Sequence, residues 1–276
     1  MTYGEACLKG RKMLEDQGIE GAAADAWYLM ADICGISRSF YYLHQGESMP
    51  EEMRQAYFHA VDRRCLHIPL QYITGRQEFM GLTFTVTPDV LIPRQDTEVL
   101  VEEVLKYLKP GMEALDLCTG SGCIGVSLKH YVPGAAIWAS DISRKALKVA
   151  EKNALGNQAE VHFVHSDMFE HIHQKFDIIV SNPPYIPSAQ IPELMPEVRD
   201  HEPVTALDGS GDGLYFYHKI TESSSLYLKE KGMLFYEIGY DQGRAVSEIL
   251  RENGFENVTV IRDLAGLDRV VAGRRK

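Results

Sequence analysis

A glycine-rich segment near the middle of the chain, residues 115–125, limits the possible folds more than any other stretch. Ala114, Leu115 and Leu117 are typical of a buried strand, and apolar residues at helical spacing follow the glycines. Gly120, Gly122 and Gly125 fit the pattern G-x-G-x-x-G, in which glycines let backbone amides approach a ligand closely. The segment therefore predicts a strand, a tight turn and a helix in succession, with a ligand at the turn. A dinucleotide is one candidate.

Strands and helices continue to alternate through residues 96–276. Strands are expected at 135–140, 161–164, 176–181 and 232–238 and near Val258 and Val270, and helices at 143–153, at 242–253 and after a cap at Asp96. Such alternation predicts a mostly parallel sheet with helices on both faces. Ligands of such sheets bind at the carboxyl ends of the strands.

Three aspartates stand at the ends of successive predicted strands. Asp116 precedes the glycine turn, where its carboxylate can face the ammonium group of a ligand through water or backbone amides. Asp141 ends the next strand, the usual place for an acid that binds ribose hydroxyls, and Asp167 ends the third, where it can meet an adenine amino group. Three acids suit the cation S-adenosylmethionine better than the pyrophosphate of NAD. The alternative is that Asp141 and Asp167 only cap helices.

The expected strand at 176–181 runs directly into Asn182-Pro183-Pro184-Tyr185. Two consecutive prolines cannot continue a sheet, because they lack N–H groups and their φ is fixed, so they form a rigid corner. The Asn182 side-chain oxygen and the Pro183 carbonyl can each accept a hydrogen bond from one NH₂ group, and Tyr185 offers an aromatic face. Alone, the four residues would favour a simple turn. At a strand end after a glycine turn, they predict a corner that orients a planar nitrogen for methylation.

Residues 1–75 lack the alternation of strands and predict a small helical domain. Thr2 and Glu5 have the spacing of a capping box. In residues 76–95, apolar residues alternate with threonines after Gly81, which predicts a hairpin that links two domains.

Charge and residue counts disfavour several classes of site. The net charge of −11 argues against a nucleic-acid substrate, and no apolar run approaches the ~20 residues that span a bilayer, so a cytoplasmic location is expected. The five cysteines form no C-x-x-C pair and the clustered histidines have no acid or cysteine to complete a ligand set, so no metal site is expected. Arg94 can neutralise a carboxylate of a ligand or pair with Asp96 or Glu98.

The sequence resembles the release factor glutamine methyltransferases, the PrmC or HemK family, over nearly its whole length. Besides the glycine turn and Asn182-Pro183-Pro184-Tyr185, the matching segments are 69–75, 92–98, 202–203, 206–207, 212–214, 237–239, 242–243, 263–266 and 268–269. The combination is specific, whereas Asn-Pro-Pro-Tyr alone also occurs in nucleic-acid adenine methyltransferases.

This resemblance implies an α/β fold with three parts. They are a helical substrate-docking domain at 1–75, a β-hairpin linker at 76–95 and a class I S-adenosylmethionine-dependent methyltransferase domain, Rossmann-like with a mostly parallel sheet, at 96–276. The implied reaction methylates the N5 amide nitrogen of the glutamine in the Gly-Gly-Gln motif of class 1 peptide chain release factors and leaves S-adenosylhomocysteine. Release factors would be the partners, with no role for a membrane.

The resemblance also implies roles for single residues. Asn182, Pro183 and Tyr185 would be catalytic, and with Pro184 they would bind the glutamine. Cofactor contacts would come from Cys118, Thr119, Gly120, Ser121, Gly122, Asp141, Asp167, Met168 and Asn182. Cys118 stands where the family more often has glycine, so only its backbone is expected to make contact. Met168 stands where some relatives have tryptophan.

Three rival functions differ from this reading. Adenine N6 methylation of nucleic acid is the alternative, and the acidic charge argues against it. A non-catalytic binding module conflicts with the intact glycine turn, Asp141 and Asn182. An NAD oxidoreductase would need a suitably placed proton-relay pair, and none stands out.

Overall fold

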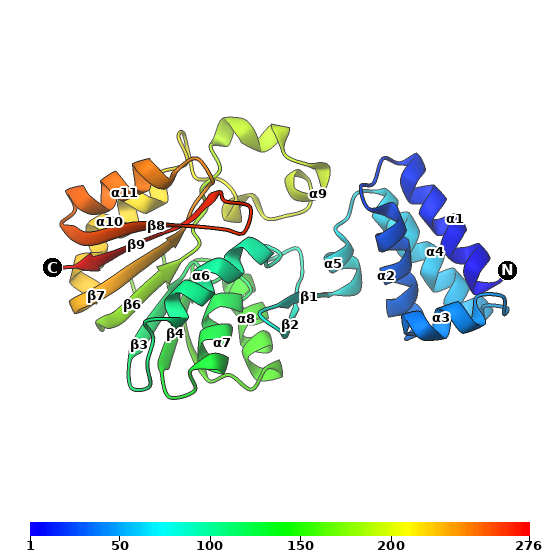
Figure 1. Cartoon of the computed structure of the whole chain (residues 1–276), viewed down its shortest axis with the longest axis horizontal. Coiled ribbons are helices and arrows are strands. Elements are labelled where there is room, and N and C mark those ends of the chain that lie inside the picture. Colours follow the sequence, from blue (N-terminus) through cyan, green and yellow to red (C-terminus); the bar gives the residue numbers. More distant parts are fainter. The chain divides into compact units, whose positions relative to one another are not determined.

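The computed structural model describes all 276 residues, which form two compact units (Figure 1). The first unit comprises Met1–Gly75 together with Met195–His201, and the second comprises Arg76–Leu194 and Glu202–Lys276. The helical unit therefore includes a short segment from the second half of the chain. No helix in the structure combines the length and the apolar character needed to cross a lipid bilayer.

The first unit is entirely helical. Its helices are α1 (Tyr3–Asp16), α2 (Ala22–Cys34), α3 (Arg38–His44), α4 (Glu51–Cys65), α5 (Leu70–Thr74) and α9 (Pro196–Arg199). The capping box of Thr2 and Glu5 is present, with each side chain bonded to the other residue's backbone N–H. Leu14, Met30 and Tyr57 pack in a core from α1, α2 and α4, where each is fully buried.

A buried arginine attaches α9 to the helical unit. Arg64 on α4 is only 7% exposed, and its guanidinium lies 2.7 Å from Asp25 Oδ2 and 2.9 Å from Glu197 Oε1. Glu197 belongs to α9. A buried arginine needs such partners because an unpaired buried charge is strongly destabilising. This charge pairing explains why the segment folds with helices that precede it by more than a hundred residues.

The second unit is built on a seven-stranded sheet in the order β5-β4-β3-β6-β7-β9-β8. Its strands are β3 (Glu113–Leu117), β4 (Ala136–Asp141), β5 (Val161–His165), β6 (Phe176–Ser181), β7 (Leu228–Glu237), β8 (Phe255–Arg262) and β9 (Asp268–Arg275). Strands β3 to β7 pair in parallel, and β9 runs antiparallel to both β7 and β8. The predicted mostly parallel sheet is confirmed.

Helices cover both faces of this sheet (Figure 1). They are α6 (Gln95–Leu105), α7 (Cys123–Tyr131), α8 (Arg144–Gly156), α10 (Tyr215–Tyr227) and α11 (Gly243–Glu252), with short 3-10 helices η1 (Ser188–Glu193) and η2 (Val204–Ala206). Because side chains alternate along a strand, Ile178 and Val180 of β6 pack with α6, α7 and α8, while Ile179 packs with α10 and α11.

Two local expectations were wrong. Asp96 does not cap the first helix of this unit: α6 begins at Gln95 after the extended residue Arg94, and no side chain caps it. Asp96 instead lies 3.1 Å from the guanidinium of Arg269. Strand β7 begins at Leu228 rather than near residue 232 and contacts β6 through an irregular register. The helix α10 was not expected at all.

The hairpin consists of β1 (Arg76–Phe79) and β2 (Leu82–Thr85). Met80 and Gly81 form its two-residue turn, and both have positive φ, as such a turn requires. Asn153 of α8 hydrogen-bonds both the N–H and the carbonyl of Thr85 and also donates to the carbonyl of Ser121 in the glycine turn. The hairpin thus folds as part of the sheet unit.

Candidate active site

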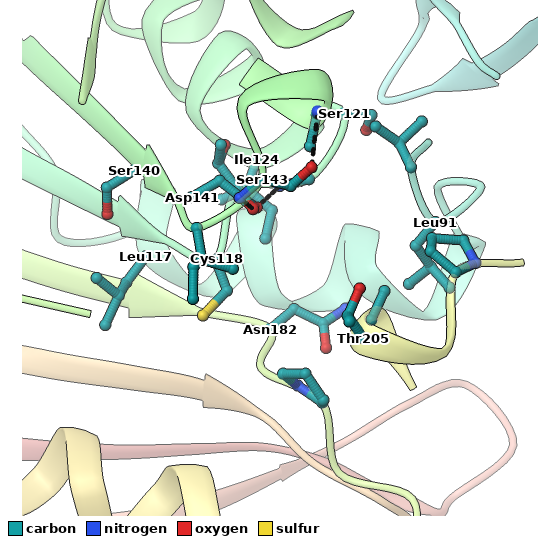
Figure 2. A pocket seen from close by; sticks show the side chains of 18 of the residues that line it. Leu91, Leu117, Cys118, Ser121, Ile124, Ser140, Asp141, Ser143, Asn182 and Thr205 are labelled. Atoms are coloured by element: carbon teal, nitrogen blue, oxygen red, sulfur yellow. Dashed lines mark hydrogen bonds between the residues drawn. The ribbon is translucent and has the colours of Figure 1, made fainter. Parts of the chain in front are cut away.

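A pocket of about 370 Å³ lies at the carboxyl ends of β3, β4 and β6. The sheet order reverses at β3, whose neighbours are β4 and β6, and crevices at such points bind ligands in open α/β sheets. Figure 2 shows Cys118, Asp141 and Asn182 entering the pocket from the ends of these adjacent strands.

The pocket collects most of the predicted site residues. Those that line it are Cys118, Thr119, Gly120, Ser121, Asp141, Asp167, Met168, Asn182 and Pro184. Three others, Gly122, Pro183 and Tyr185, do not line it. Further lining residues that were given no role come from two loops and α6, namely Asp89, Val90, Leu91, Pro93, Thr97, Pro203, Val204, Thr205 and Ala206. The two loops overlap segments that match the family, 92–98 for the first and 202–203 with 206–207 for the second. The sequence therefore marked these loops but indicated no role for them.

Asp116 holds the glycine turn in place. Its carboxylate is fully buried and does not line the pocket. Its Oδ2 atom accepts hydrogen bonds from the Thr119 hydroxyl and from Gly125 N, the latter at 2.9 Å. Burial raises the pKa of Asp116 to about 7. Asp116 therefore shapes the turn. Its side chain does not line the pocket, and an interaction with a ligand through water or amides stays a prediction.

Gly122 has a steric reason to be glycine. Its φ is +82°, and a Cβ there would lie 2.9 Å from the Cβ of Ala150 on α8. Any side chain would push α8 away from the turn. Gly122, which precedes the first residue of α7, thus allows α8 to pack closely against the turn.

Asp141 bridges the glycine turn and the start of α8. One carboxylate oxygen accepts from Gly120 N at 2.8 Å and the other from Ser143 N at 2.8 Å. Burial raises the pKa of Asp141, and these two backbone N–H groups oppose that shift. Ser143, and not Asp141, caps α8. Each oxygen keeps a free lone pair, so the carboxylate can also accept hydrogen bonds from a ligand's hydroxyl groups.

Asp167 and Met168 follow β5 and line the pocket. The Asp167 carboxylate is 45% exposed and lies 3.2 Å from Lys219 Nζ on α10. Asp167 caps no helix. It can accept a hydrogen bond from an amino group, although Lys219 already offsets part of its charge.

The Asn-Pro-Pro-Tyr corner follows β6 directly, and its groups are held from several sides. Asn182 Nδ2 donates to Thr97 Oγ1 at 3.4 Å. The carbonyl of Tyr185 accepts from Gln242 Nε2 at 3.0 Å, and a Cβ on Gly209 would lie 2.7 Å from the Tyr185 Cα. Both prolines are buried, while Asn182 and Tyr185 are half-buried. These contacts hold the corner in place beside the two prolines, whose fixed φ angles predict a rigid backbone.

Arg94 pairs with neither Asp96 nor Glu98. Its guanidinium lies 2.5 Å from Oε1 of Glu202, whose side chain is 1% exposed, whereas Glu98 accepts from the N–H of Met80. Arg94 and the residues that follow Glu202 both line the pocket. This ion pair therefore joins the two loops that had no assigned role.

These groups fit the charge and chemistry of S-adenosylmethionine. The pocket offers the carboxylates of Asp141 and Asp167 to a cationic ligand, and no lysine lines it. Arg94 is the one cation in the lining, and Glu202 pairs with it. A pyrophosphate group would meet mainly negative charge here.

Cys118 has φ of +64°, a left-handed conformation that suits glycine. Replacing it with glycine should change the free energy of unfolding by less than ~1 kcal/mol, because relief of backbone strain offsets the greater freedom of the unfolded chain. Cys118→Val should cost about 2 kcal/mol, since a β-branched residue strongly resists positive φ. Urea denaturation measures both values.

Activity gives the second readout for Cys118. Burial raises the pKa of its thiol, so the group stays protonated and is a poor nucleophile at neutral pH. Cys118→Gly should therefore retain kcat/KM. A large loss of kcat/KM would mean that the thiol takes part in the reaction.

Comparison with known proteins gives matches along the whole chain. The family described as PrmC N-terminal domain matches residues 5–75, and the Methyltransferase small domain matches residues 94–196. The release factor glutamine methyltransferase of Geobacter sulfurreducens is 42% identical over 96% of this chain and 93% of its own length. The enzyme of the same name from Moorella thermoacetica is 42% identical over 100% of this chain and 99% of its own.

Among solved structures, a methyltransferase from Pyrococcus furiosus superposes with a TM-score of 0.55. It is 16% identical and covers 71% of this chain and 89% of its own. At that identity the match concerns the fold alone, which is that of a methyltransferase.

Proposed function

The chain belongs to the release factor glutamine methyltransferases, and on that premise we propose that it methylates the glutamine of the Gly-Gly-Gln motif in class 1 peptide chain release factors. The methyl group comes from S-adenosylmethionine and is transferred to the side-chain amide nitrogen, N5. One observation carries the proposal: in a chain of this family, Asn182-Pro183-Pro184-Tyr185 follows β6 at the edge of a pocket that also holds the glycine turn and Asp141.

The chemistry required of the corner is orientation. S-adenosylmethionine supplies an electrophilic methyl group on a positively charged sulfur. An amide nitrogen is a weak nucleophile, because its lone pair is delocalised into the carbonyl. Asn182 Oδ1 and the Pro183 carbonyl are proposed to accept the two N–H hydrogens of the substrate amide and so direct the nitrogen. Orientation of this kind is worth a large rate factor, and the nitrogen releases one proton after transfer.

The remaining predicted residues are assigned by their place around the pocket. Asp141 is proposed to bind the ribose hydroxyls of the cofactor and Asp167 its adenine amino group. Residues 118–122 would provide backbone contacts, and Met168 would pack against the adenine. Tyr185, which lies behind the pocket lining, would complete the wall of the glutamine site.

The release factor is the proposed partner, and residues 1–75 are proposed to dock it. The match of residues 5–75 to the PrmC N-terminal domain supports a separate docking role for this part of the chain. The net charge of −11 supports a protein substrate over nucleic acid.

A labelling experiment tests the substrate class. The protein is incubated with S-adenosylmethionine carrying a radiolabelled methyl group, together with either a release factor or double-stranded DNA. Label in the release factor and none in the DNA is expected. Label in DNA alone would overturn the proposal in favour of adenine methylation.

A further inference from the structure

The prolines of the Asn-Pro-Pro-Tyr corner do not by themselves fix where its carbonyl groups point. A proline ring fixes φ, whereas ψ of Pro183 still spans about 40° before a second proline, and ψ sets the direction of the Pro183 carbonyl. The chain enters the corner from a fixed position, because Ser181 pairs with Leu117 of β3 and Tyr236 of β7. The direction of the Pro183 carbonyl therefore depends on how the chain is held where it leaves the corner.

The peptide bond between Tyr185 and Ile186, where the chain leaves the corner, is held at both of its polar atoms. The Tyr185 carbonyl accepts from Gln242 Nε2 at 3.0 Å. Ile186 N donates to the carbonyl of Leu207 at 3.0 Å, and the Ile186 carbonyl accepts from Gly209 N at 2.8 Å. A planar peptide with both ends bonded cannot tilt without breaking one of the bonds. The exit of the corner is thus held as well as its entry.

The neighbours of Gln242 fix the orientation of its side-chain amide. Gln242 is 8% exposed and stands in the turn that joins β7 to α11. Its Oε1 atom accepts from Gly239 N at 2.9 Å and lies 3.3 Å from the Tyr217 hydroxyl. A backbone N–H can only donate, so the oxygen must face Gly239 and the NH₂ group must face the Tyr185 carbonyl. The same NH₂ group lies 3.5 Å from the carbonyl of Gly213.

We propose that Gln242 is a positioning residue, which fixes the exit of the corner and so directs the Pro183 carbonyl toward the substrate amide. The inference rests on the proposed function, in which that carbonyl accepts an N–H of the glutamine side chain. Gln242 does not line the pocket, and neither does Tyr185, whose carbonyl it holds. Its effect therefore reaches the substrate nitrogen through the backbone of the corner.

Gly213 shows how little room surrounds this hydrogen bond. Its φ is +78°, and a Cβ there would overlap the Tyr185 carbonyl oxygen and lie 2.8 Å from Gln242 Nε2. A side chain at this position would therefore displace the two bonded atoms. Gly211 belongs to the same loop, but a Cβ there would have no atom within 4 Å, and its φ is not positive. The loop thus holds one glycine that the bond requires and one that it does not.

Gln242→Met tests the proposal, because methionine is similar in size to glutamine and has no N–H to donate. We expect kcat for the release factor to fall about 10- to 100-fold, since a misplacement of about 1 Å can lower a rate 100-fold. KM for the release factor and Kd for the cofactor should change less than about threefold, because the residues that Gln242 contacts do not line the pocket. Tyr217→Phe removes the hydroxyl beside Gln242 Oε1 and leaves the bond to Tyr185, so it should keep the wild-type kcat.

Alanine at the two glycines gives a matched pair of variants in one loop. Gly213→Ala should lower kcat as Gln242→Met does, whereas Gly211→Ala should keep it. The double variant Gly213→Ala with Gln242→Met should be no slower than the slower single variant, because both changes remove the same bond. Thermal unfolding shows which variants are folded at the assay temperature. If Gly213→Ala is not, Gln242→Met beside Tyr217→Phe still decides the question.

Wild-type kcat in Gln242→Met would overturn the proposal. So would an equal fall in kcat for Tyr217→Phe, losses that multiply in the double variant, or a loss of cofactor affinity as large as the loss of kcat. Each variant is measured beside wild-type protein with the same release factor. Absence of transfer by the wild type would instead refute the proposed function, so the two failures are distinguishable.

Discussion

Asn182→Ala is expected to lower the rate of methyl transfer by about 10³-fold and to leave cofactor binding largely intact. The variant removes the side-chain acceptor that orients the substrate amide. Loss of one preorganised hydrogen-bonding group at a reacting centre costs about 10²–10³-fold, and loss of orientation adds to that. Asn182 lies at the end of β6, and the strand does not depend on its side chain for pairing. Single-turnover transfer of labelled methyl to a release factor measures the rate, and calorimetric titration measures cofactor affinity.

Asn253→Ala is the matched control for this change. Asn253 ends α11, where its side chain donates to the carbonyl of Ile249, and it does not line the pocket. It should keep full activity. Normal turnover by Asn182→Ala would rule out the nitrogen-holding role of the corner.

Asp141→Ala is expected to weaken cofactor binding by about 100-fold. The variant removes the proposed acceptor of the ribose hydroxyls and also leaves Gly120 N and Ser143 N without their partner. Hydrogen bonds to a charged group contribute about 1.5–3 kcal/mol each, and one such bond at the upper end corresponds to the expected loss. The kcat at saturating cofactor should change much less, because Asp141 does not touch the substrate amide.

Asp141→Asn sharpens this test. Asparagine has one acceptor oxygen in place of two, so cofactor affinity should fall between the wild type and Asp141→Ala. Calorimetric titration of the three proteins measures the order. An unchanged Kd in Asp141→Ala would show that the carboxylate only holds the glycine turn.

The strands that lead to the site could be predicted because their signals are local. The strand at 176–181 coincides with β6, since the apolar residues Ile178, Ile179 and Val180 stand shortly before two prolines that cannot continue a sheet. Helix α10 was not predicted, and the reason also lies in its local sequence. Its buried face includes Thr221 and Ser224 beside Tyr217 and Ile220, so no clear apolar stripe marks it.

The contacts that organise the site could not be predicted, because they join distant parts of the chain. Arg94 meets Glu202 across 108 residues, although Asp96 and Glu98 stand much closer in sequence. Glu237 reaches Tyr185 across 52 residues. Asp116 is a different case: its place beside the glycine turn suggested a ligand contact through water or amides, and its fully buried side chain bonds Thr119 and Gly125. Sequence position at a strand end does not say which face the carboxylate takes.

The central claim is that this chain methylates a glutamine side-chain nitrogen, and tandem mass spectrometry of a treated release factor tests it most directly. A class 1 release factor is incubated with the protein and S-adenosylmethionine, digested, and its peptides are fragmented. The account predicts one added methyl group on the side chain of the glutamine in the Gly-Gly-Gln motif, and no such group after treatment with Asn182→Ala. A methyl group on any other residue, or an unmodified Gly-Gly-Gln peptide after wild-type treatment, would contradict it.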